Sequence, residues 1–408
     1  MINKHDPIRH LSYLRQSLSQ DNEAIGFFIS AGCPLAVPMP DGKWPLIPDV
    51  KNLTIAINAV LTADKEYSCL LSELEKAGKS QENIEDILSF LRSLLAVSKG
   101  GEVRGLTEEN LNKLEKSVCD EIVKKLDVLH PNDETPYHSL CKWVGSIDRK
   151  IAIEIFTTNY DLLLEQALED LEVPYFDGFV GSRKSFFDLR AVEDNMIPEH
   201  WSRLWKIHGS INWHQEKRGD ERVVWRSSSP EDGTSHLIYP SHLKYEESRK
   251  MPYLALIDQL NRFIRRKSSF LVLCGYSFND GHLNDAIVNA LKSNPTGMVL
   301  ALQFGSYKKT KAEGGGERYP NANRLAKRQH NLNVWTDDKA IIGTNLGDWG
   351  NARSPEVVDK DLMSFVHSVH LEGEAGATVP NVKLGDFLEF TNFLKKFIGL
   401  DVGDQLEK

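Results

Sequence analysis

The chain has 408 residues and a net charge of −9, which allows a large core and two or three domains and argues against a protein whose main surface tracks nucleic acid. Its five cysteines are scattered without a CxxC pair, so neither a zinc ribbon nor a disulfide framework is encoded, and a reduced, cytoplasmic protein fits best. The amino terminus lacks the apolar core of a signal peptide, and no window approaches the ~18 apolar residues of a membrane-spanning helix, so no membrane association is expected.

The first expected elements lead into a turn of small residues. Residues 6–20 place apolar side chains at helical spacing, and residues 24–29 form an apolar strand. The strand runs directly into Ser30, Ala31 and Gly32. Small residues here let the pyrophosphate of a ligand approach the backbone, although turn geometry alone explains them about equally well. The proline-rich loop at 34–49 has no helical or strand period and is typical of a cover over a pocket.

From residue 51 to residue 135 the pattern becomes helical throughout, with a hinge at the Lys-Gly-Gly of residues 99–101. The stretch therefore predicts an α-helical insertion between the first strand of the sheet and the next. Its charged residues read as solvated faces, and such an insertion can also serve as a subunit contact.

The chain is organised around residues 151–168, where a β-branched apolar run leads into a polar turn at 157–161 and then into a leucine-rich helix. Ligands of open α/β sheets bind outside the carboxyl ends of the strands, and a helix amino terminus there offers free N–H groups to phosphates or ribose hydroxyls. The turn is thus a candidate ligand contact. The alternative is that Thr158 or Asn159 merely caps the helix.

A further strand at 204–207 ends in a histidine, His208, followed by Gly209 and Ser210. A lone histidine is more often structural than catalytic. The position of His208 at a strand end, and the near-neutral pKa that histidine ordinarily has, suit general-base work. Other histidines nearby match no metal-ligand spacing and are interpreted as solvated or structural, namely His214, His236 and His242.

The following segments predict more elements of the same sheet. Residues 223–225 and 236–239 predict a hairpin, and residues 252–264 predict a helix. The most hydrophobic strand, at 270–274, ends in a turn at 275–280 and leads into another helix, and a strand at 298–302 comes next.

Strands that end in polar or glycine-bearing turns and alternate with helices define the α/β class with a doubly wound parallel sheet. The carboxyl ends of such strands lie along one edge, so the sequence predicts that four turns meet there. These turns are 30–34, 157–161, 208–210 and 275–280.

The last part of the chain predicts weaker elements. Residues 308–323 read as a flexible polar loop, and residues 331–335 as a last edge strand. Helices are expected at 355–370 and 385–399. The second of these helices carries many aromatic residues, which indicates either a subunit interface or burial within the same chain.

The turn motifs occur along the chain in the same order as in a known family. The chain resembles the sirtuin-like (silent-information-regulator) NAD-binding fold, specifically its bacterial branch found in antiphage defence systems. The resemblance covers roughly residues 20–305 and implies a Rossmann-like catalytic domain at 1–310 that contains the 51–135 insertion, followed by a C-terminal extension at 320–408. Four motifs carry the resemblance: Ser30-Ala31-Gly32 for the family's Gly-Ala-Gly turn, Thr158-Asn159-Tyr160-Asp161 for Gln-Asn-Ile-Asp, His208-Gly209 for the catalytic His-Gly, and Gly275-Tyr276-Ser277 for Gly-Thr-Ser.

The resemblance implies a role for each matched residue. Asn159 is expected to hold the nicotinamide ribose and a water, and His208 to be the general base. Asp161 is expected to bond the nicotinamide carboxamide. The residues expected to contact the pyrophosphate, the other phosphate or the adenosine side are Ser30, Ala31, Gly32, Gly275, Tyr276 and Ser277.

The departures from the family pattern bear on activity. Sirtuin deacetylases carry a four-cysteine zinc module after the His-Gly motif, and nothing in this sequence can bind zinc in that way, so no metal is expected and deacetylation is doubtful. Thr158 replaces the usual Gln, which puts the ribose contacts of this position in doubt. Ser30 replaces the first Gly of the Gly-Ala-Gly turn.

The resemblance therefore implies an NAD+ glycohydrolase that cleaves the nicotinamide–ribose bond and depletes NAD+ to abort infection. Two other classes stay open: a module that binds NAD or ADP-ribose without turnover, and an NAD-dependent protein deacylase. Defence enzymes of this type resemble one another in being silent until triggered. This implies a HerA-type hexameric ATPase as partner, or self-assembly into a higher homo-oligomer.

Overall fold

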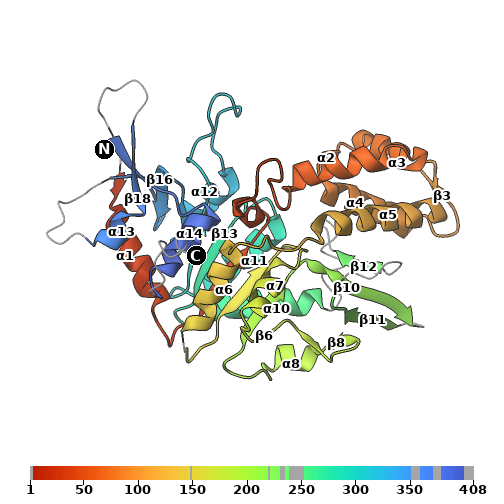
Figure 1. Ribbon diagram of the computed structural model, residues 1–408. Helices are drawn as coiled ribbons and strands as arrows, with labels where there is room; N and C mark the ends of the chain where they lie inside the picture. Colours follow the sequence, from red (N-terminus) through yellow and green to blue (C-terminus); the bar gives the residue numbers. More distant parts are fainter. Residues whose placement is uncertain are drawn as a thin grey trace.

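The computed structural model describes residues 3–147, 149–218, 221–229, 235–238, 252–350, 359–370 and 378–398. Within them the chain builds a large, mostly parallel sheet with helices on both faces (Figure 1), which confirms the α/β, doubly wound class. Across the sheet the strands follow the order β1 (Asn3–His5), β17 (Asn345–Trp349), β16 (Lys339–Ile342), β15 (Leu332–Trp335), β14 (Met298–Leu302), β13 (Phe270–Cys274), β2 (Ile25–Ile29), β5 (Glu154–Thr157), β9 (Ser202–Lys206) and β6 (Tyr175–Phe176).

The centre of the sheet is parallel because each strand returns through a helical connection. Strands β14, β13, β2, β5 and β9 all pair in parallel with their neighbours. From β2 the chain adds β5 and β9 on one side and then β13, β14 and β15 on the other, so its winding reverses between β2 and β13. This reversal creates the crevice at the carboxyl ends where such sheets bind ligands.

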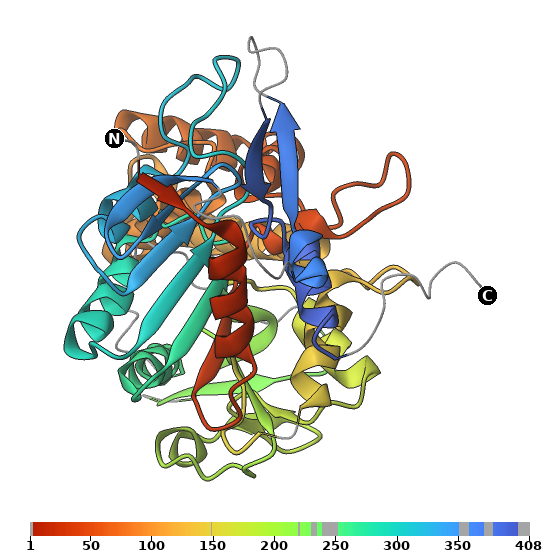
Figure 2. The same cartoon turned by 90° about the vertical axis from the view of Figure 1, so that its left-hand side faces the viewer.

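Both faces of the central strands are buried, and alternate residues of β2 enter different cores. Phe27 belongs to one apolar cluster and Phe28 to the other. The first cluster is completed by α1 (Pro7–Leu18), α6 (Pro136–Ser146) and α14 (Phe387–Lys395), which lie over one face (Figure 2). The second is completed by α10 (Tyr253–Arg265), α11 (Gly281–Ser293) and α12 (Pro320–Ala326).

The stretch predicted as a helical insertion forms a separate layer beside the carboxyl edge of the sheet (Figure 1). It contains α2 (Val50–Leu61), α3 (Lys65–Lys76), α4 (Ile84–Val97) and α5 (Glu108–Leu126). It is not helical throughout, because β3 (Glu102–Val103) and β4 (Leu106–Thr107) form a small hairpin. Its turn uses Arg104 and Gly105, both with positive φ, a geometry that a periodicity search does not detect.

A second, antiparallel sheet follows β9. Its strands lie in the order β12 (Ser235–Ile238), β10 (Gly209–Arg218), β11 (Glu221–Arg226), β8 (Ser185–Phe187) and β7 (Phe179–Val180). The predicted hairpin of residues 223–225 with 236–239 is wrong, because β11 and β12 pair with opposite sides of β10 and not with each other. Residue 239 and His242 lie outside the described residues.

Three expectations for the last part of the chain need correction. The strand at β15 is interior, since β16, β17 and β1 extend the sheet beyond it. Residues 308–323 are folded: Arg318 bonds both carboxylate oxygens of Glu313 at 2.9 and 2.8 Å, and α12 already starts at Pro320. The chain does not form one helix over 355–370. It forms the short α13 (Lys360–Met363) and then β18 (Val366–His370), and β18 pairs with β19 (Thr378–Val382). Residues 355–358 are outside the described part.

The aromatic residues of α14 pack inside the same chain. The ring of Phe387 lies 5.3 Å from that of Tyr137 on α6, and the ring of Phe390 lies 6.1 Å from that of Phe27 on β2. Of the two interpretations left open by the sequence, burial within the chain is therefore the one observed. No helix in the described ranges is long and apolar enough to cross a membrane.

Candidate functional site

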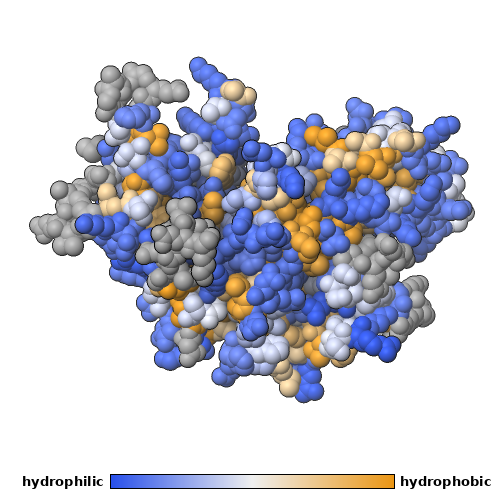
Figure 3. Space-filling view, viewed as in Figure 1, coloured by the Kyte–Doolittle hydropathy of each residue, from blue (hydrophilic) through white to orange (hydrophobic). Residues whose placement is uncertain are grey.

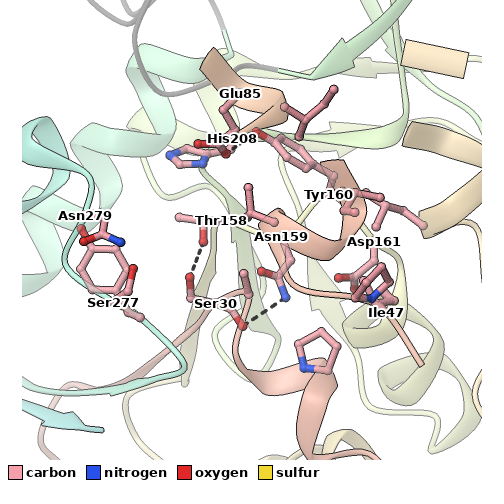
Figure 4. A pocket seen from close by; sticks show the side chains of 18 of the residues that line it. Ser30, Ile47, Glu85, Thr158, Asn159, Tyr160, Asp161, His208, Ser277 and Asn279 are labelled. Carbon is pink, nitrogen blue, oxygen red and sulfur yellow. Dashed lines mark hydrogen bonds between the residues drawn. The ribbon is translucent and has the colours of Figure 1, made fainter. Parts of the chain in front are cut away.

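A cavity of about 250 Å³ lies at the carboxyl edge of the parallel sheet, where the four predicted turns meet (Figure 4). The turn after β2 contributes Ser30 and Ala31, and the turn after β13 contributes Tyr276 and Ser277. The middle of the cavity is lined by residues of the turns after β5 and β9, namely Thr158, Asn159, Tyr160, Asp161 and His208. The structure thus brings seven of the nine predicted site residues to one cavity.

The other two, Gly32 and Gly275, pack against each other behind the cavity wall. The amide of Gly32 donates to the carbonyl oxygen of Gly275 over 3.1 Å, and a Cβ on Gly32 would lie 2.8 Å from the Cα of Gly275. Gly275 also has a φ of +69°, which favours glycine. The small residues expected to admit a pyrophosphate therefore allow the two turns to approach each other, and contact of these glycines with a phosphate stays a prediction.

Asn159 is held by the neighbouring turn. Its side-chain Nδ2 donates to the carbonyl oxygen of Ser30 over 3.4 Å, and the hydroxyls of Ser30 and Thr158 lie 2.7 Å apart (Figure 4). The backbone amide of Asn159 donates to Oγ1 of Thr157 over 3.0 Å. With 9% of its surface exposed, the amide is fixed at the cavity wall and still reachable by a small molecule.

The capping interpretation of this turn is wrong. Helix α7 (Leu163–Asp170) begins beyond the turn, and its cap position is Leu162, which makes no side-chain capping bond. Neither Thr158 nor Asn159 is therefore used to start the helix. Instead Oδ1 of Asp161 accepts from the amide of Leu163 over 3.1 Å.

Asp161 is buried at the base of the cavity, and its surroundings are charged. Burial raises its pKa to about 6, while the nearby Lys206 ammonium acts in the opposite direction. Lys206 is itself buried, pairs with Oε1 of Glu165 at 2.8 Å and bonds the backbone oxygen of Asp161. This lysine precedes His208 by two positions, so it fastens the end of β9 to the turn that carries Asn159.

His208 lies at the end of β9, with 5% of its surface exposed at the cavity. Backbone hydrogen bonds on both sides of it join the two turns: Ile207 donates to the oxygen of Thr157 over 2.8 Å, and Ile211 donates to that of Tyr160 over 3.0 Å. Nε2 of His208 lies 3.5 Å from Oδ2 of Asp280. The imidazole of His208 and the side-chain amide of Asn159 thus line one cavity, which offers a group that can orient a ligand and a group that can accept a proton.

The insertion and the proline-rich loop supply the apolar part of the cavity wall. The loop contributes Pro34, Ile47 and Pro48, as its prediction as a cover implies, and the insertion contributes apolar side chains from three of its helices, among them Val50, Leu53, Ile84 and Leu126. The hydroxyl of Tyr160 donates to Oε1 of Glu85, near the start of α4, over 3.4 Å. The insertion is therefore part of the site and not an appendage.

Sequence reasoning missed Glu85 and Asp280 as site residues. Glu85 lies in the first turn of a helix whose orientation no local pattern reveals. Asp280 carried a signal, since it follows a strand end and starts a helix, but its proximity to His208 depends on the spacing of non-adjacent strands. The other nearby histidine, His214, is fully buried and bonds the hydroxyl of Ser227 at 2.6 Å, in agreement with a structural role.

No group of three or more His, Cys, Asp or Glu side chains with metal-binding geometry occurs among the described residues. The cavity instead offers an amide, an imidazole and hydroxyls beside an apolar wall. This combination suits a polar ligand with one flat, apolar group. It can orient sugar hydroxyls and accept a proton from one of them or from a water.

Comparison with known proteins finds a match for part of the chain. Residues 153–325 match the sequence profile of the SIR2-like domain. Two solved structures are similar over 72% of this chain and 87% of their own chains. One is a Sir2 mutant with a p53 peptide and NAD, with 12% sequence identity and a TM-score of 0.32. The other is Sir2 with a p53 peptide and NAD+, with 10% sequence identity and a TM-score of 0.28. The curated proteins contain no match.

Proposed function

We propose that the chain is an NAD+ glycohydrolase, which cleaves the nicotinamide–ribose bond to give nicotinamide and ADP-ribose. One observation carries the proposal: Asn159 and His208, which come from different strands of a SIR2-like domain, line the same cavity. The cavity lies at the carboxyl edge of the sheet beside the point where the winding reverses, which is where α/β sheets bind nucleotides.

The chemistry of NAD+ explains why few groups suffice. Nicotinamide leaves as a neutral molecule from a cationic ring, so no acid is needed to protonate it. The barrier lies in the positive charge that develops on the ribose. A site must orient the ribose, shield the cation from all but one water, and accept a proton from that water or from a ribose hydroxyl.

Each of these requirements has a residue at the cavity. Asn159, with its amide held by Ser30, orients the ribose and the water. His208 accepts the proton. Asp161 bonds the nicotinamide carboxamide, and the apolar wall from the insertion and the proline-rich loop excludes bulk water around the flat ring. Ser30, Ala31, Tyr276 and Ser277 lie on the side where the phosphates and adenosine extend.

Incubation of the purified chain with NAD+ tests the proposal, with free nicotinamide measured in the presence and absence of an acylated peptide. Release without peptide supports the glycohydrolase. Release of nicotinamide only in the presence of the peptide indicates the protein deacylase. Binding of NAD+ with no release of nicotinamide, with or without the peptide, indicates the module without turnover. Either of the last two results overturns the proposal.

We also propose a setting for the activity. Depletion of NAD+ in antiphage defence requires an enzyme that stays silent until triggered, which fits control by a HerA-type hexameric ATPase or by a higher homo-oligomer. The insertion is the candidate contact surface, because α2 exposes 52% of Ile55 and 50% of Val60, and apolar residues gather over this layer in Figure 3. Failure of the chain to co-elute with the ATPase encoded beside it, together with a monomeric mass, would contradict this setting.

A further inference from the structure

The carboxylate of Asp280 makes contacts in two directions. Its Oδ1 caps α11 by accepting from the amides of His282 and Leu283 over 3.1 and 3.2 Å. Its Oδ2 lies 3.5 Å from Nε2 of His208, and both side chains are at least nine-tenths buried. The helix cap therefore fixes the direction in which the second oxygen points, which is toward the imidazole.

The loop that carries Asp280 is held by several independent contacts. The hydroxyl of Tyr276 donates to Oδ1 of Asn284 over 2.8 Å, and Nδ2 of Asn284 donates to the oxygen of Phe278 over 2.9 Å. Phe278 is fully buried with a φ of +58°, a strained conformation for a bulky residue. Strain of this kind persists only where the surroundings determine the backbone, and it is concentrated at functional sites.

From these contacts we propose that Asp280 is a positioning residue that orients the imidazole of His208 and stabilises its protonated form. The inference rests on the proposed function, in which His208 takes up a proton. A carboxylate against Nε2 holds the ring in one orientation and balances the positive charge that proton transfer creates, as a buried carboxylate does for a catalytic histidine in other hydrolases.

Other titratable groups also face this part of the cavity. The ring of Tyr160 lies 6.4 Å from that of His208, Glu85 is bonded to Tyr160, and Asp161 lines the same cavity. These groups belong to the turn after β5 and to the insertion. Asp280, at the N-cap of α11, is a group for which the structure shows an ion-pair distance to the imidazole.

A titration of His208 tests the proposal without any need for activity. The protein is labelled with carbon-13 at the Cε1 position of histidine, and the signal of His208 among the 13 histidines is identified by its loss in His208→Ala. Asp280→Asn keeps the helix cap, because Asn and Asp cap equally well. We expect this variant to melt at the parent temperature and to lower the midpoint of the His208 titration by about one pH unit.

The matched control is Asp64→Asn. Asp64 caps α3 in the same way, with Oδ1 accepting from Glu66 and Tyr67, and does not line the cavity. This variant is expected to leave the His208 titration unchanged. An unchanged midpoint in Asp280→Asn, or an equal change in Asp64→Asn, would overturn the proposal.

Kinetics give a second readout. We expect Asp280→Asn to lower kcat for NAD+ by about 10-fold to 100-fold with KM changed by less than about three-fold, and to cause no further loss in a His208→Ala background. An equal loss in both backgrounds indicates a purely structural role. If the parent chain releases no nicotinamide under any condition, the proposed function fails, while the titration still decides the role of Asp280.

Discussion

The hydroxyl of Tyr160 donates a hydrogen bond to Oε1 of Glu85 over 3.4 Å, and so links the turn that carries Asn159 to the helical insertion. The link joins residues 75 positions apart in the sequence. The position of the insertion therefore depends on Tyr160, which lines the cavity, and the position of Tyr160 depends on the insertion.

We therefore predict that Tyr160→Phe loosens the start of α4. Loss of one hydrogen bond worth about 1 kcal/mol should raise amide hydrogen exchange there by about five-fold. Tyr67→Phe is the control, because the hydroxyl of Tyr67 bonds Asn58 within the insertion. Exchange that stays at the parent level around Glu85 in Tyr160→Phe would show that the link contributes nothing.

The contact between Gly32 and Gly275 predicts a loss of stability on substitution. A Cβ on Gly275 would lie 2.7 Å from the amide nitrogen of Cys33, and its φ of +69° is unfavourable for alanine. Gly275→Ala should destabilise the protein by about 2–4 kcal/mol in urea unfolding. The control is Gly42→Ala, with a φ of +75° and open space around it, which should cost only about 1 kcal/mol. Equal losses for the two variants would contradict a role for close packing.

Much of this arrangement follows from the sequence. The apolar runs before Ser30, Asn159 and Gly275 are short and bounded by polar turns, and parallel strands place such turns at one edge, so the meeting of the turns could be predicted. The sequence pattern does not show which side of a turn faces the cavity. The sequence therefore does not show that Gly32 and Gly275 contact each other, as they do in the structure, and their contact with a phosphate stays a prediction.

Other features depend on long-range packing that leaves no local signal. Residues 331–335 read as an edge strand because the pairing of β16, β17 and β1 involves segments from opposite ends of the chain. The aromatic residues of α14 show that the helix is buried but not what covers it. Glu85 lies in an ordinary amphipathic helix, and only the fold brings it to Tyr160.

Asp161 predicts a specific dependence of stability on pH. Burial raises its pKa to about 6 from an ordinary 3.8, so the unfolded chain loses this proton at lower pH than the folded chain does. Its contribution to stability is therefore full below about pH 4 and is lost as the pH rises to about 6, with a total change of about 3 kcal/mol. Asp161→Asn retains an acceptor for the amide of Leu163 and removes the titration.

Thermal melting of both proteins between pH 4 and pH 7 measures this effect. The melting temperature of Asp161→Asn should rise relative to that of the parent as the pH increases through this window. A difference between the two proteins that stays constant from pH 4 to pH 7 would mean that the carboxyl has no raised pKa in the folded chain.

The proposed reaction predicts that the amide of Asn159 and the imidazole of His208 act on the same ribose. Asn159→Ala and His208→Ala should each lower NAD+ hydrolysis by roughly 100-fold or more, since each removes a positioning group or the base. Because the two side chains serve one step, the double variant should lose little more than either single variant. Melting curves of the variants separate a loss of chemistry from a loss of fold.

The release of nicotinamide from NAD+ by the purified chain tests the central claim most directly. It is measured with and without the proposed HerA-type ATPase, and compared with release by the Asn159→Ala/His208→Ala double variant. We expect release by the parent under at least one of the two conditions and a rate lower by roughly 100-fold or more in the double variant. A folded double variant that consumes NAD+ at the parent rate, or a parent chain that releases no nicotinamide under either condition, would contradict the assignment of this cavity as an NAD+ glycohydrolase site.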